Sequence, residues 1–172
     1  MPDPPLRLRR PVHPLAREAF AALARLGQGV LGEAPERVYF SRAAIPRRPL
    51  RNEPEIEALF AEHGFEIVRP ETHPFETQVA LARGAKLIAG PAGSAMHLAA
   101  LAPPSTRLLI LCSPNSFELT ECFLNPVAGR LGLVFGRAET GDRWAPWRIA
   151  PSDVAAGIAG HFALGRVAQV RA

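Results

Sequence analysis

The sequence predicts an α/β fold, a doubly wound, Rossmann-like parallel sheet with helices on both faces. Between residues 37 and 112, short β-rich runs alternate with segments in which apolar residues recur at helical spacing. That alternation is typical of successive βαβ units. The short runs are continuously apolar, as expected for parallel strands covered on both faces. The 172 residues, 48% of them hydrophobic, suffice for one domain with a full core.

The first helix is expected over residues 14–27, after an extended arm over residues 1–13. Gly27 and Gly29 are expected to end it. Its helical spacing rests on Leu15, Ala19, Ala22, Leu23 and Leu26. We interpret residues 1–30 as an N-terminal arm and helix, suited to a position between domains, and residues 31–172 as the Rossmann-like domain.

Strands are predicted over residues 37–41, 65–68, 86–89 and 107–112, and helices over residues 52–64, 74–83 and 94–101. Asn52 can cap the first of these helices, because Glu55 follows three residues later as in a capping box.

Beyond residue 113 the pattern predicts a helix near residues 117–123, a strand near residues 133–135 and a last helix over residues 152–164. We expect Trp144 and Trp147 to pack that end of the chain against the sheet.

Composition narrows the classes of function. No apolar stretch reaches the ~20 residues that span a bilayer, and residues 1–13 lack the apolar core of a signal peptide. We therefore expect a cytoplasmic protein, with peripheral membrane association left open. Cys112 and Cys122 do not make a disulfide framework or a metal site. The net charge of +4 comes almost entirely from arginine, whose planar fork of donors matches phosphate.

Ligands of open parallel sheets bind beyond the carboxyl ends of the strands. The turn Gly90-Pro91-Ala92-Gly93-Ser94 follows the third predicted strand and opens a predicted helix. Its glycines allow close approach of a ligand, and the helix amides can bind an anion, so Gly90, Gly93 and Ser94 are candidate phosphate-binding residues. A tight turn with no ligand explains the same glycines equally well. The spacing matches neither a dinucleotide-binding fingerprint nor a P-loop.

An arginine-rich loop is expected at the same edge of the sheet. Arg42, Arg47, Arg48 and Arg51 lie within ten residues after the first predicted strand. A single surface arginine is usually just solvated, but four beside a glycine turn favour contact with phosphate. Glu71 lies at the end of the second predicted strand, where its carboxylate can accept hydrogen bonds from ribose hydroxyls. Alternatively, its negative charge only favours the start of a helix through the helix dipole.

Histidine supplies the candidate acid–base groups. His97, one turn into the helix predicted after Gly93, is expected to face the phosphate and is our candidate catalytic residue. His73 is a second candidate, and His63 is expected to cap the end of a helix. No Ser-His-Asp order, Cys-His pair or carboxylate pair for a metal stands out, so we expect no metal and no required cofactor.

Five short motifs occur in a fixed order along residues 37–112. They are Val38-Tyr39-Phe40-Ser41-Arg42, Arg48 with Arg51-Asn52-Glu53, Gly64-Phe65-Glu66 with Pro70-Glu71, Gln78-Val79, and Gly90-Pro91-Ala92-Gly93-Ser94-Ala95-Met96-His97. In this order they resemble the carboxyl half of glycosyltransferase family 61. Each motif is weak alone, whereas all five in sequence are fairly specific.

The resemblance implies one half of a GT-B-like enzyme, which has two Rossmann-like domains and transfers a sugar with inversion from a nucleotide donor. The donor is commonly a UDP-sugar, and no metal is required. The resemblance also implies that Arg42, Arg48, Arg51 and the amides of Gly93 and Ser94 hold the pyrophosphate. Glu71 and Gln78 are then expected near the nucleoside.

Two residues depart from the family pattern. Ala92 stands where the family's turn has a histidine, and Leu98 stands where an asparagine often follows. We expect a donor-binding domain for glycosyl transfer, acting in synthesis of a capsular or other polysaccharide or a glycoconjugate. The chain is expected to be too short for the whole catalytic unit, and to work on a carbohydrate acceptor with a separate amino-terminal domain or as a homo-oligomer.

The alternative is a non-catalytic, degenerate nucleotide-binding or interaction module, which the loss of the histidine at Ala92 favours. Nucleic-acid binding is not expected, because only 7% of the residues are aromatic and few of them lie among the arginines.

Overall fold

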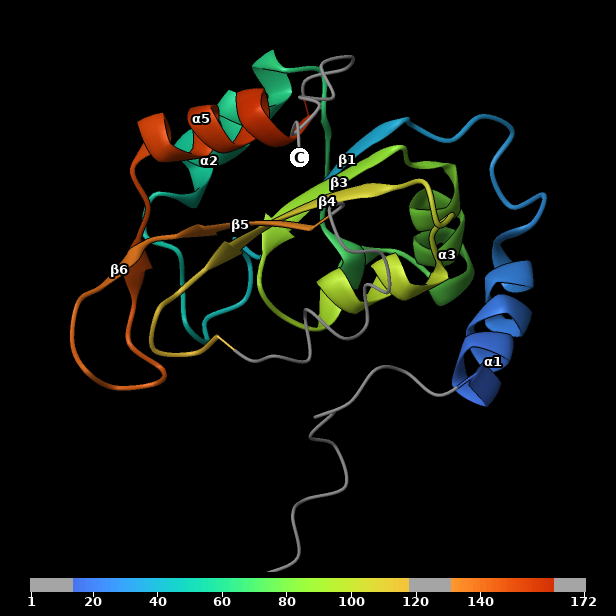
Figure 1. Cartoon of the computed structure of the whole chain (residues 1–172), viewed down its shortest axis with the longest axis horizontal. Helices are drawn as coiled ribbons and strands as arrows, with labels where there is room; N and C mark the ends of the chain where they lie inside the picture. Colours follow the sequence, from blue (N-terminus) through green and yellow to red (C-terminus); the bar gives the residue numbers. More distant parts are fainter. Residues whose placement is uncertain (1–13, 118–130, 163–172) are drawn as a thin grey trace, which may run out of the picture.

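The computed structural model describes residues 14–117 and 131–162, which form three layers: helices, a parallel sheet, and helices again (Figure 1). The sheet has five strands in the order β2-β1-β3-β4-β5, and every neighbouring pair is parallel. The strands are β1 (Arg37–Phe40), β2 (Glu66–Val68), β3 (Leu87–Pro91), β4 (Arg107–Cys112) and β5 (Leu131–Phe135). The predicted doubly wound α/β fold is confirmed.

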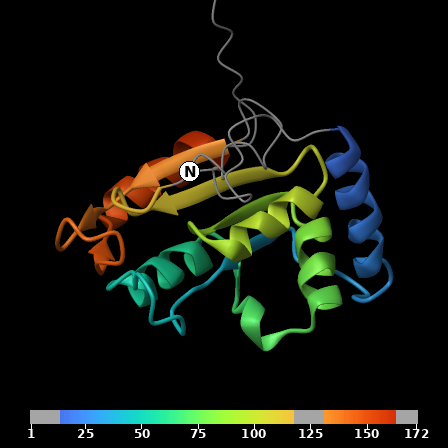
Figure 2. The same cartoon turned by 90° about the horizontal axis from the view of Figure 1, so that it is seen from below.

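Helices cover both faces of the sheet. One face carries two helices that contact each other, α2 (Glu53–Glu62) and α5 (Pro151–Phe162) (Figure 1). The other carries α1 (Pro14–Ala24), α3 (Phe75–Gly84) and the 3-10 helix η3 (Ser94–Leu101), as the turned view in Figure 2 also shows. The single-turn 3-10 helices are η1 (Arg25–Gly27) and η2 (Pro70–Thr72). An antiparallel pair lies beside the main sheet, β6 (Arg137–Ala138) and β7 (Trp147–Arg148).

Side chains alternate between the two faces along each strand, so the sheet has a hydrophobic core on both sides. On β1, Val38 and Phe40 pack toward α3 and η3, whereas Tyr39 packs toward α2 and α5. On β4, Ile110 and Leu111 divide in the same way. All five side chains are fully buried, and burying an apolar side chain stabilises the fold by about 1.5–3 kcal/mol. Burial on both faces is why continuous apolar runs mark these strands.

The predicted elements agree closely with the structure. One strand differs in length, and one helix differs in its type. Strand β3 is longer than predicted, because it includes Gly90 and Pro91. The helix predicted over residues 94–101 is a 3-10 helix, in which the Met96 N–H donates to the Gly93 carbonyl at 2.9 Å. Short segments accept this tighter winding. The helix predicted near residues 117–123 lies outside the described residues, apart from Phe117.

Helix α1 turns a different face to the protein than its apolar spacing suggests. Leu15 and Leu23 are exposed, at 67% and 42%, and Leu26 and Val30 are also exposed. The docking side is instead formed by small residues and a partly buried phenylalanine, namely Ala24, Gly27 and Phe20. At Gly27 a Cβ atom would lie 2.5 Å from the backbone nitrogen of Ala80. Close approach to α3 therefore selects small residues, and the leucines remain outside.

Asn52 has a different role from the predicted helix cap. It precedes α2, but its side chain makes no capping hydrogen bond. Its amide nitrogen donates to the Ile149 carbonyl at 2.9 Å, and its amide oxygen accepts the Ile149 N–H at 3.3 Å. The same amide nitrogen contacts the Glu55 carboxylate at 3.1 Å. Asn52 thus ties the start of α2 to the segment after β7.

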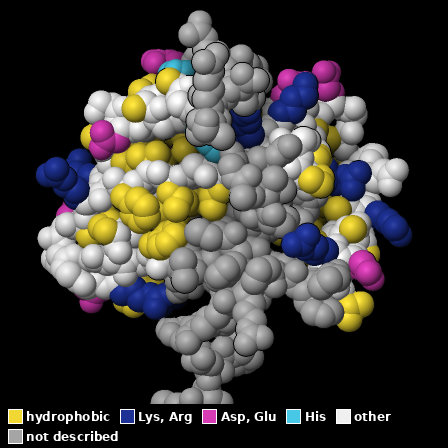
Figure 3. Space-filling model, viewed as in Figure 1, with side chains coloured by type: hydrophobic (Ala, Val, Ile, Leu, Met, Phe, Trp, Pro, Cys, Tyr) yellow, Lys and Arg dark blue, Asp and Glu magenta, His cyan; other side chains and the backbone are white. Residues whose placement is uncertain are grey.

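The outer edge of the sheet at β5 is only partly covered by the described residues. Residues 131–134 are half-buried, and Phe135 is exposed. Hydrophobic side chains gather over this part of the molecule in Figure 3, with Lys and Arg side chains around them.

The strand order places a topological switch point between β1 and β3. From β1 the chain passes through α2 to β2 on one side, returns through α3 to β3 on the other side, and continues outward to β4 and β5. The loops after β1 and β3 therefore leave the sheet in opposite directions. A crevice opens between such loops at the carboxyl ends of the strands, and this is where doubly wound sheets bind ligands.

Candidate functional site

A cavity of about 600 Å³ lies at this switch point. Its walls come from the loops after β1, β3 and β4, from η2, α3 and η3, and from the loop between β6 and β7. Seven of the nine predicted site residues line it: Arg42, Arg48, Glu71, Gln78, Gly93, Ser94 and His97. The other two, Arg51 and Gly90, do not.

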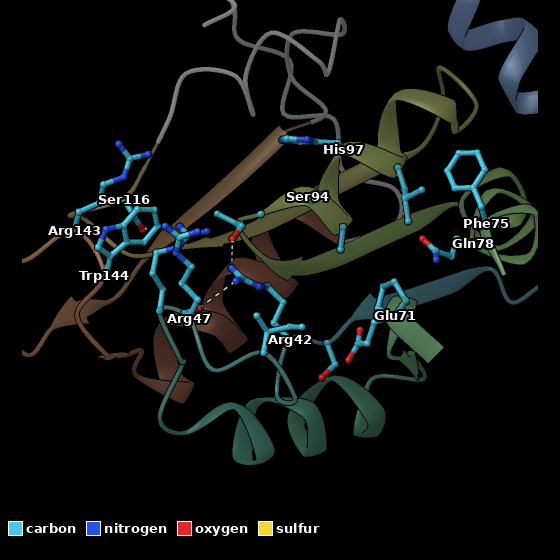
Figure 4. A pocket seen from close by; sticks show the side chains of 18 residues that line it. Arg42, Arg47, Glu71, Phe75, Gln78, Ser94, His97, Ser116, Arg143 and Trp144 are labelled. Carbon is cyan, nitrogen blue, oxygen red and sulfur yellow. Dashed lines mark hydrogen bonds between the residues drawn. The ribbon is translucent and has the colours of Figure 1, made fainter. Parts of the chain in front are cut away.

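The cavity has two ends of different character (Figure 4). Glu71, Gln78 and Phe75 lie at one end, and Arg47, Ser116, Arg143 and Trp144 lie at the other. Arg42 and Ser94 lie between the two ends. Four arginines line the cavity, and Glu71 is the one acidic side chain among the described residues that do so. The site is therefore suited to an elongated anionic ligand.

The two glycines of the predicted phosphate turn have different structural tasks. Gly90 lies inside β3 with a φ of 156°, and a Cβ atom there would lie 2.5 Å from the Phe40 carbonyl oxygen. Its missing side chain allows β3 to approach β1. Gly93, with a φ of 155°, lines the cavity, and a Cβ atom there would lie 2.9 Å from Nη1 of Arg42. Gly93 thus leaves room for the guanidinium beside the turn.

Arg42 joins the two loops that flank the switch point. Its Nη1 donates to the Ala92 carbonyl at 2.7 Å, and its Nη2 donates to the Arg47 carbonyl at 3.2 Å (Figure 4). Its backbone N–H donates to Oε1 of Glu53 at 2.7 Å. The guanidinium therefore carries positive charge to the centre of the cavity on a fixed side chain.

Arg48 and Arg51 differ, although they lie three residues apart. Arg48 has a φ of 54°, an uncommon backbone conformation for a residue with a side chain, and its Nη1 donates to Oγ of Ser116 at 2.8 Å at the cavity wall. Arg51 points away and pairs with Glu139 at 3.2 Å on the exposed surface. The positive φ reverses the chain between them and explains why a run of arginines does not share one target.

Two glutamates of α2, Glu53 and Glu57, accept hydrogen bonds from the end of β1 and the start of the loop that follows it. Glu53 is 2% exposed, and its Oε1 accepts hydrogen bonds from the Arg42 N–H at 2.7 Å and from the Tyr39 hydroxyl at 3.4 Å. The Ser41 hydroxyl donates to Glu57 at 2.5 Å. Burial raises the pKa of Glu53, while the hydrogen bond from Arg42 acts in the opposite direction. Burial, followed by the neighbouring Glu53 and Glu57 carboxylates, raises the pKa of Tyr39.

At the other end, Glu71 is exposed on η2 and points toward the cavity, where its carboxylate can accept hydrogen bonds from hydroxyl groups. The Gln78 amide donates to the His73 carbonyl at 2.9 Å. Phe75 is 45% exposed beside them. His97 is half-buried on η3 and lines the cavity beyond Ser94, while His73 does not line it. The predicted C-terminal role of His63 agrees with its Nδ1 contact of 2.8 Å to the Leu59 carbonyl at the end of α2.

The sequence analysis missed the residues of the arginine-rich end that lie beyond β4. Trp147 is buried as expected, but Trp144 is not packed against the sheet. It is 42% exposed and lines the cavity, with Cζ of Arg47 3.7 Å from its ring centroid. Arg143 and Ser116 line the same end. The available signal was an arginine next to a tryptophan in a polar, glycine-containing loop, which is unlike a core segment.

Residues 14–117 and 131–162 hold neither a metal-binding cluster nor a membrane-spanning helix. No group of three or more His, Cys, Asp or Glu side chains there is arranged to hold a metal ion. No helix in those ranges has the length and apolar character to cross a membrane.

A protein family matches the part of the chain that supplies much of the cavity wall. The model described as Glycosyltransferase 61 matches residues 6–109, well over half of the chain. The match includes β1 to β3, the arginine-rich loop and the Gly93–Ser94 turn, while the loop that carries Trp144 lies outside it. Among curated proteins, no match is found. The chain belongs to glycosyltransferase family 61, a family of enzymes that transfer sugars.

Proposed function

We propose that the cavity binds the nucleotide-sugar donor of a glycosyl transfer reaction, most simply a UDP-sugar. The observation that carries the proposal is that the Gly93–Ser94 turn lines the cavity at the switch point of the sheet together with Arg42 and Arg48. A diphosphate there would meet the turn on one side and two guanidinium groups on the other. Charge-assisted hydrogen bonds of this kind are about twice as strong as neutral ones.

The rest of the cavity supports the same orientation. Glu71 and Gln78 can contact the nucleoside at one end, where Phe75 offers an exposed ring. A ribose hydroxyl is a donor that a carboxylate such as Glu71 can accept. The volume of about 600 Å³ lies within the range of small-molecule sites, roughly 300–1,000 Å³. We propose no required metal, since the guanidinium groups of Arg42 and Arg48 can balance the diphosphate charge.

The biological setting proposed is synthesis of a polysaccharide or glycoconjugate, with a carbohydrate acceptor. Activation of that acceptor needs a base near its hydroxyl. His97 lines the cavity and is the candidate for such a proton-transfer role. We propose that a second domain or a second copy of the chain completes the acceptor side.

Thermal shift and calorimetric titration test donor binding directly. UDP and UDP-sugars should raise the melting temperature by mass action and should bind better than AMP or NAD. A ligand present at a hundred times its Kd adds about 2.7 kcal/mol of stability. If no nucleoside diphosphate shifts the melting curve at millimolar concentration, the cavity is not a donor site.

The second candidate function is a nucleotide-binding module without catalysis. Ala92 favours it, because this residue of the cavity wall stands where the family pattern has a histidine. Its carbonyl is also engaged by Arg42. Incubation of the chain with a UDP-sugar, with the free sugar measured over time, distinguishes the two functions. A catalytic domain should hydrolyse the UDP-sugar slowly. A binding module would leave the UDP-sugar intact over the same time.

A further inference from the structure

The arginine-rich end of the cavity holds an aromatic and cationic cluster that diphosphate binding leaves unused. Trp144 exposes an indole ring to this end, and Arg47 and Arg143 lie beside the ring. Cζ of Arg47 is 3.7 Å from the ring centroid, and Cζ of Arg143 is 5.1 Å from it. A guanidinium group at such a distance is attracted by the face of the indole.

The loop that carries Trp144 is held in place by the segment after β4. The Asn115 amide donates to the carbonyls of Thr140 and Asp142, at 2.6 and 3.1 Å. The Asp142 carboxylate in turn accepts a hydrogen bond from the backbone N–H of Trp144 at 2.5 Å. These bonds fix the backbone that leads into Trp144, so little ordering of this loop is needed when a ligand binds.

The loop that carries Arg47 is fastened to the same hairpin. The indole N–H of Trp147 donates to the Arg48 carbonyl at 3.2 Å, and the Arg51 N–H donates to the Trp147 carbonyl at 2.8 Å. The Arg47 carbonyl accepts the hydrogen bond from Arg42 described above. Arg47 and Trp144 are thus positioned by two loops that share one anchor, β7.

The stacked guanidinium of Arg47 still has its hydrogen-bond donors to offer. Within the described residues its side chain makes the ring contact with Trp144 and no hydrogen bond or ion pair. Stacking leaves the N–H groups in the plane of the guanidinium and directed outward. A planar fork held in this way matches a carboxylate with two parallel hydrogen bonds.

The order of groups along the cavity determines what this end receives. With the nucleoside near Glu71 and the diphosphate near Gly93, the sugar attached to the second phosphate reaches Arg47 and Trp144 (Figure 4). Among the described lining residues this end holds arginines and the Ser116 hydroxyl, and no carboxylate that could accept sugar hydroxyls. The charge there complements an anionic sugar better than a neutral one.

We propose that the donor is a nucleoside diphosphate uronic acid, whose carboxylate is bound by the guanidinium of Arg47 where it stacks on Trp144. This inference rests on the proposed donor function and adds the class of sugar to it. Arg143 adds positive charge to the same end. No covalent step is involved, and the pair acts in binding and selection.

Calorimetric titration of the full chain with UDP, UDP-glucose and UDP-glucuronate tests the proposal. UDP-glucuronate should bind on the order of tenfold more tightly than UDP-glucose, as expected for hydrogen bonds to a charged group. Arg47→Ala should remove this preference and leave UDP affinity within about twofold. Arg51→Ala is the matched control, because Arg51 lies in the same loop and pairs with Glu139 outside the cavity. It should keep the preference.

Four results would overturn the inference, and each has a distinct cause. Equal binding of the two sugar nucleotides, with UDP still bound, rejects the acidic sugar and leaves the donor site. A loss of UDP affinity in Arg47→Ala equal to the loss for UDP-glucuronate makes Arg47 a phosphate contact. Absence of UDP binding rejects the proposed function itself. Free glucuronate titrated in the presence of UDP serves as a further arm, and saturable binding with no preference among donors assigns the charge to the acceptor.

Discussion

At the scale of single residues, Glu53 couples the stability of the fold to the geometry of the site. Its carboxyl is buried beneath β1 and accepts the backbone N–H of Arg42, the arginine that connects both loops of the cavity. Because burial favours the neutral acid, the pKa of Glu53 is raised in the folded state. The folded protein therefore holds this proton at pH values where the unfolded chain has released it.

The sign of the pH dependence follows from linkage. The contribution of Glu53 to stability is fully present below the ordinary glutamate pKa of about 4.3 and is lost as pH rises through the raised folded pKa. Glu53→Gln keeps an oxygen acceptor for Arg42 but cannot ionise, so it should lack this decline. Urea unfolding of both proteins from pH 4 upward measures it. The stability of the wild type should fall relative to the variant, and parallel curves would contradict the assignment.

Arg48 and Arg51 form a matched pair at the same scale. Arg48→Ala should weaken nucleotide affinity by about 1.5–3 kcal/mol, the range for hydrogen bonds to charged groups. Its effect on the melting temperature of the free protein should be small, since Arg48 lies at the cavity wall and not in the hydrophobic core. Arg51→Ala removes a surface ion pair, worth about 0–1 kcal/mol of stability, and should leave nucleotide affinity unchanged. Calorimetry on both variants checks this contrast, and equal loss of affinity would contradict it.

At the scale of elements, β7 is short but connects the sheet with the site. It pairs with β6, and Leu50 of the arginine-rich loop forms a bridge with Trp147. The backbone N–H of Trp147 donates to the Pro49 carbonyl at 3.1 Å. Its ring is buried among the side chains of the α2 and α5 side of the core. A single tryptophan thus fixes the arginine-rich loop against the hydrophobic core.

Trp147→Phe tests this connection. The variant keeps a large ring but leaves the Arg48 carbonyl without the indole N–H, at a cost of about 1–3 kcal/mol if the carbonyl stays buried. Nucleotide affinity should also fall, since the loop that carries Arg42 and Arg48 loses an anchor. Trp144→Phe is the control, because Trp144 is exposed and its replacement should not shift the denaturation midpoint. Equal midpoints for both variants would show that the anchor is unimportant.

At the scale of the whole molecule, the described residues form a doubly wound sheet with a cavity at its switch point. We predict that the 172-residue chain binds donor but transfers no sugar to an acceptor. The GT-B-like architecture implied by the sequence would place the acceptor between two such domains. Holding two substrates together lowers the activation barrier by up to about 7–11 kcal/mol. A site that binds only the donor does not provide this effect.

Labelled UDP-sugars incubated with the purified chain and mixed acceptors measure the transfer. Donor hydrolysis serves as the internal control, because water needs no acceptor site. Robust glycoside formation would mean that the chain, or an assembly of its copies, holds a complete active site.

The sequence by itself determined the parallel sheet, most of its helices and the edge that carries the site. These features depend on local signals, namely apolar runs, helical spacing and glycine turns, which act within a few residues of one another. The position of Arg42, Arg48 and Gly93 at the cavity was predictable for the same reason. Each directly follows or closely follows a strand whose carboxyl end had been located from the apolar pattern.

Only the tertiary structure decided which neighbours of those residues reach the cavity. Arg48 and Trp147 are 99 residues apart in sequence, yet their hydrogen bond fastens the arginine-rich loop to β7, while Arg51 pairs with Glu139 outside the cavity. Trp144 reaches the cavity on a hairpin that no local pattern connects to β1. Gly90 serves the approach of β3 to β1, because a Cβ atom would strike the Phe40 carbonyl. Such contacts depend on the packing of distant segments, and spacing along the chain carries no information about them.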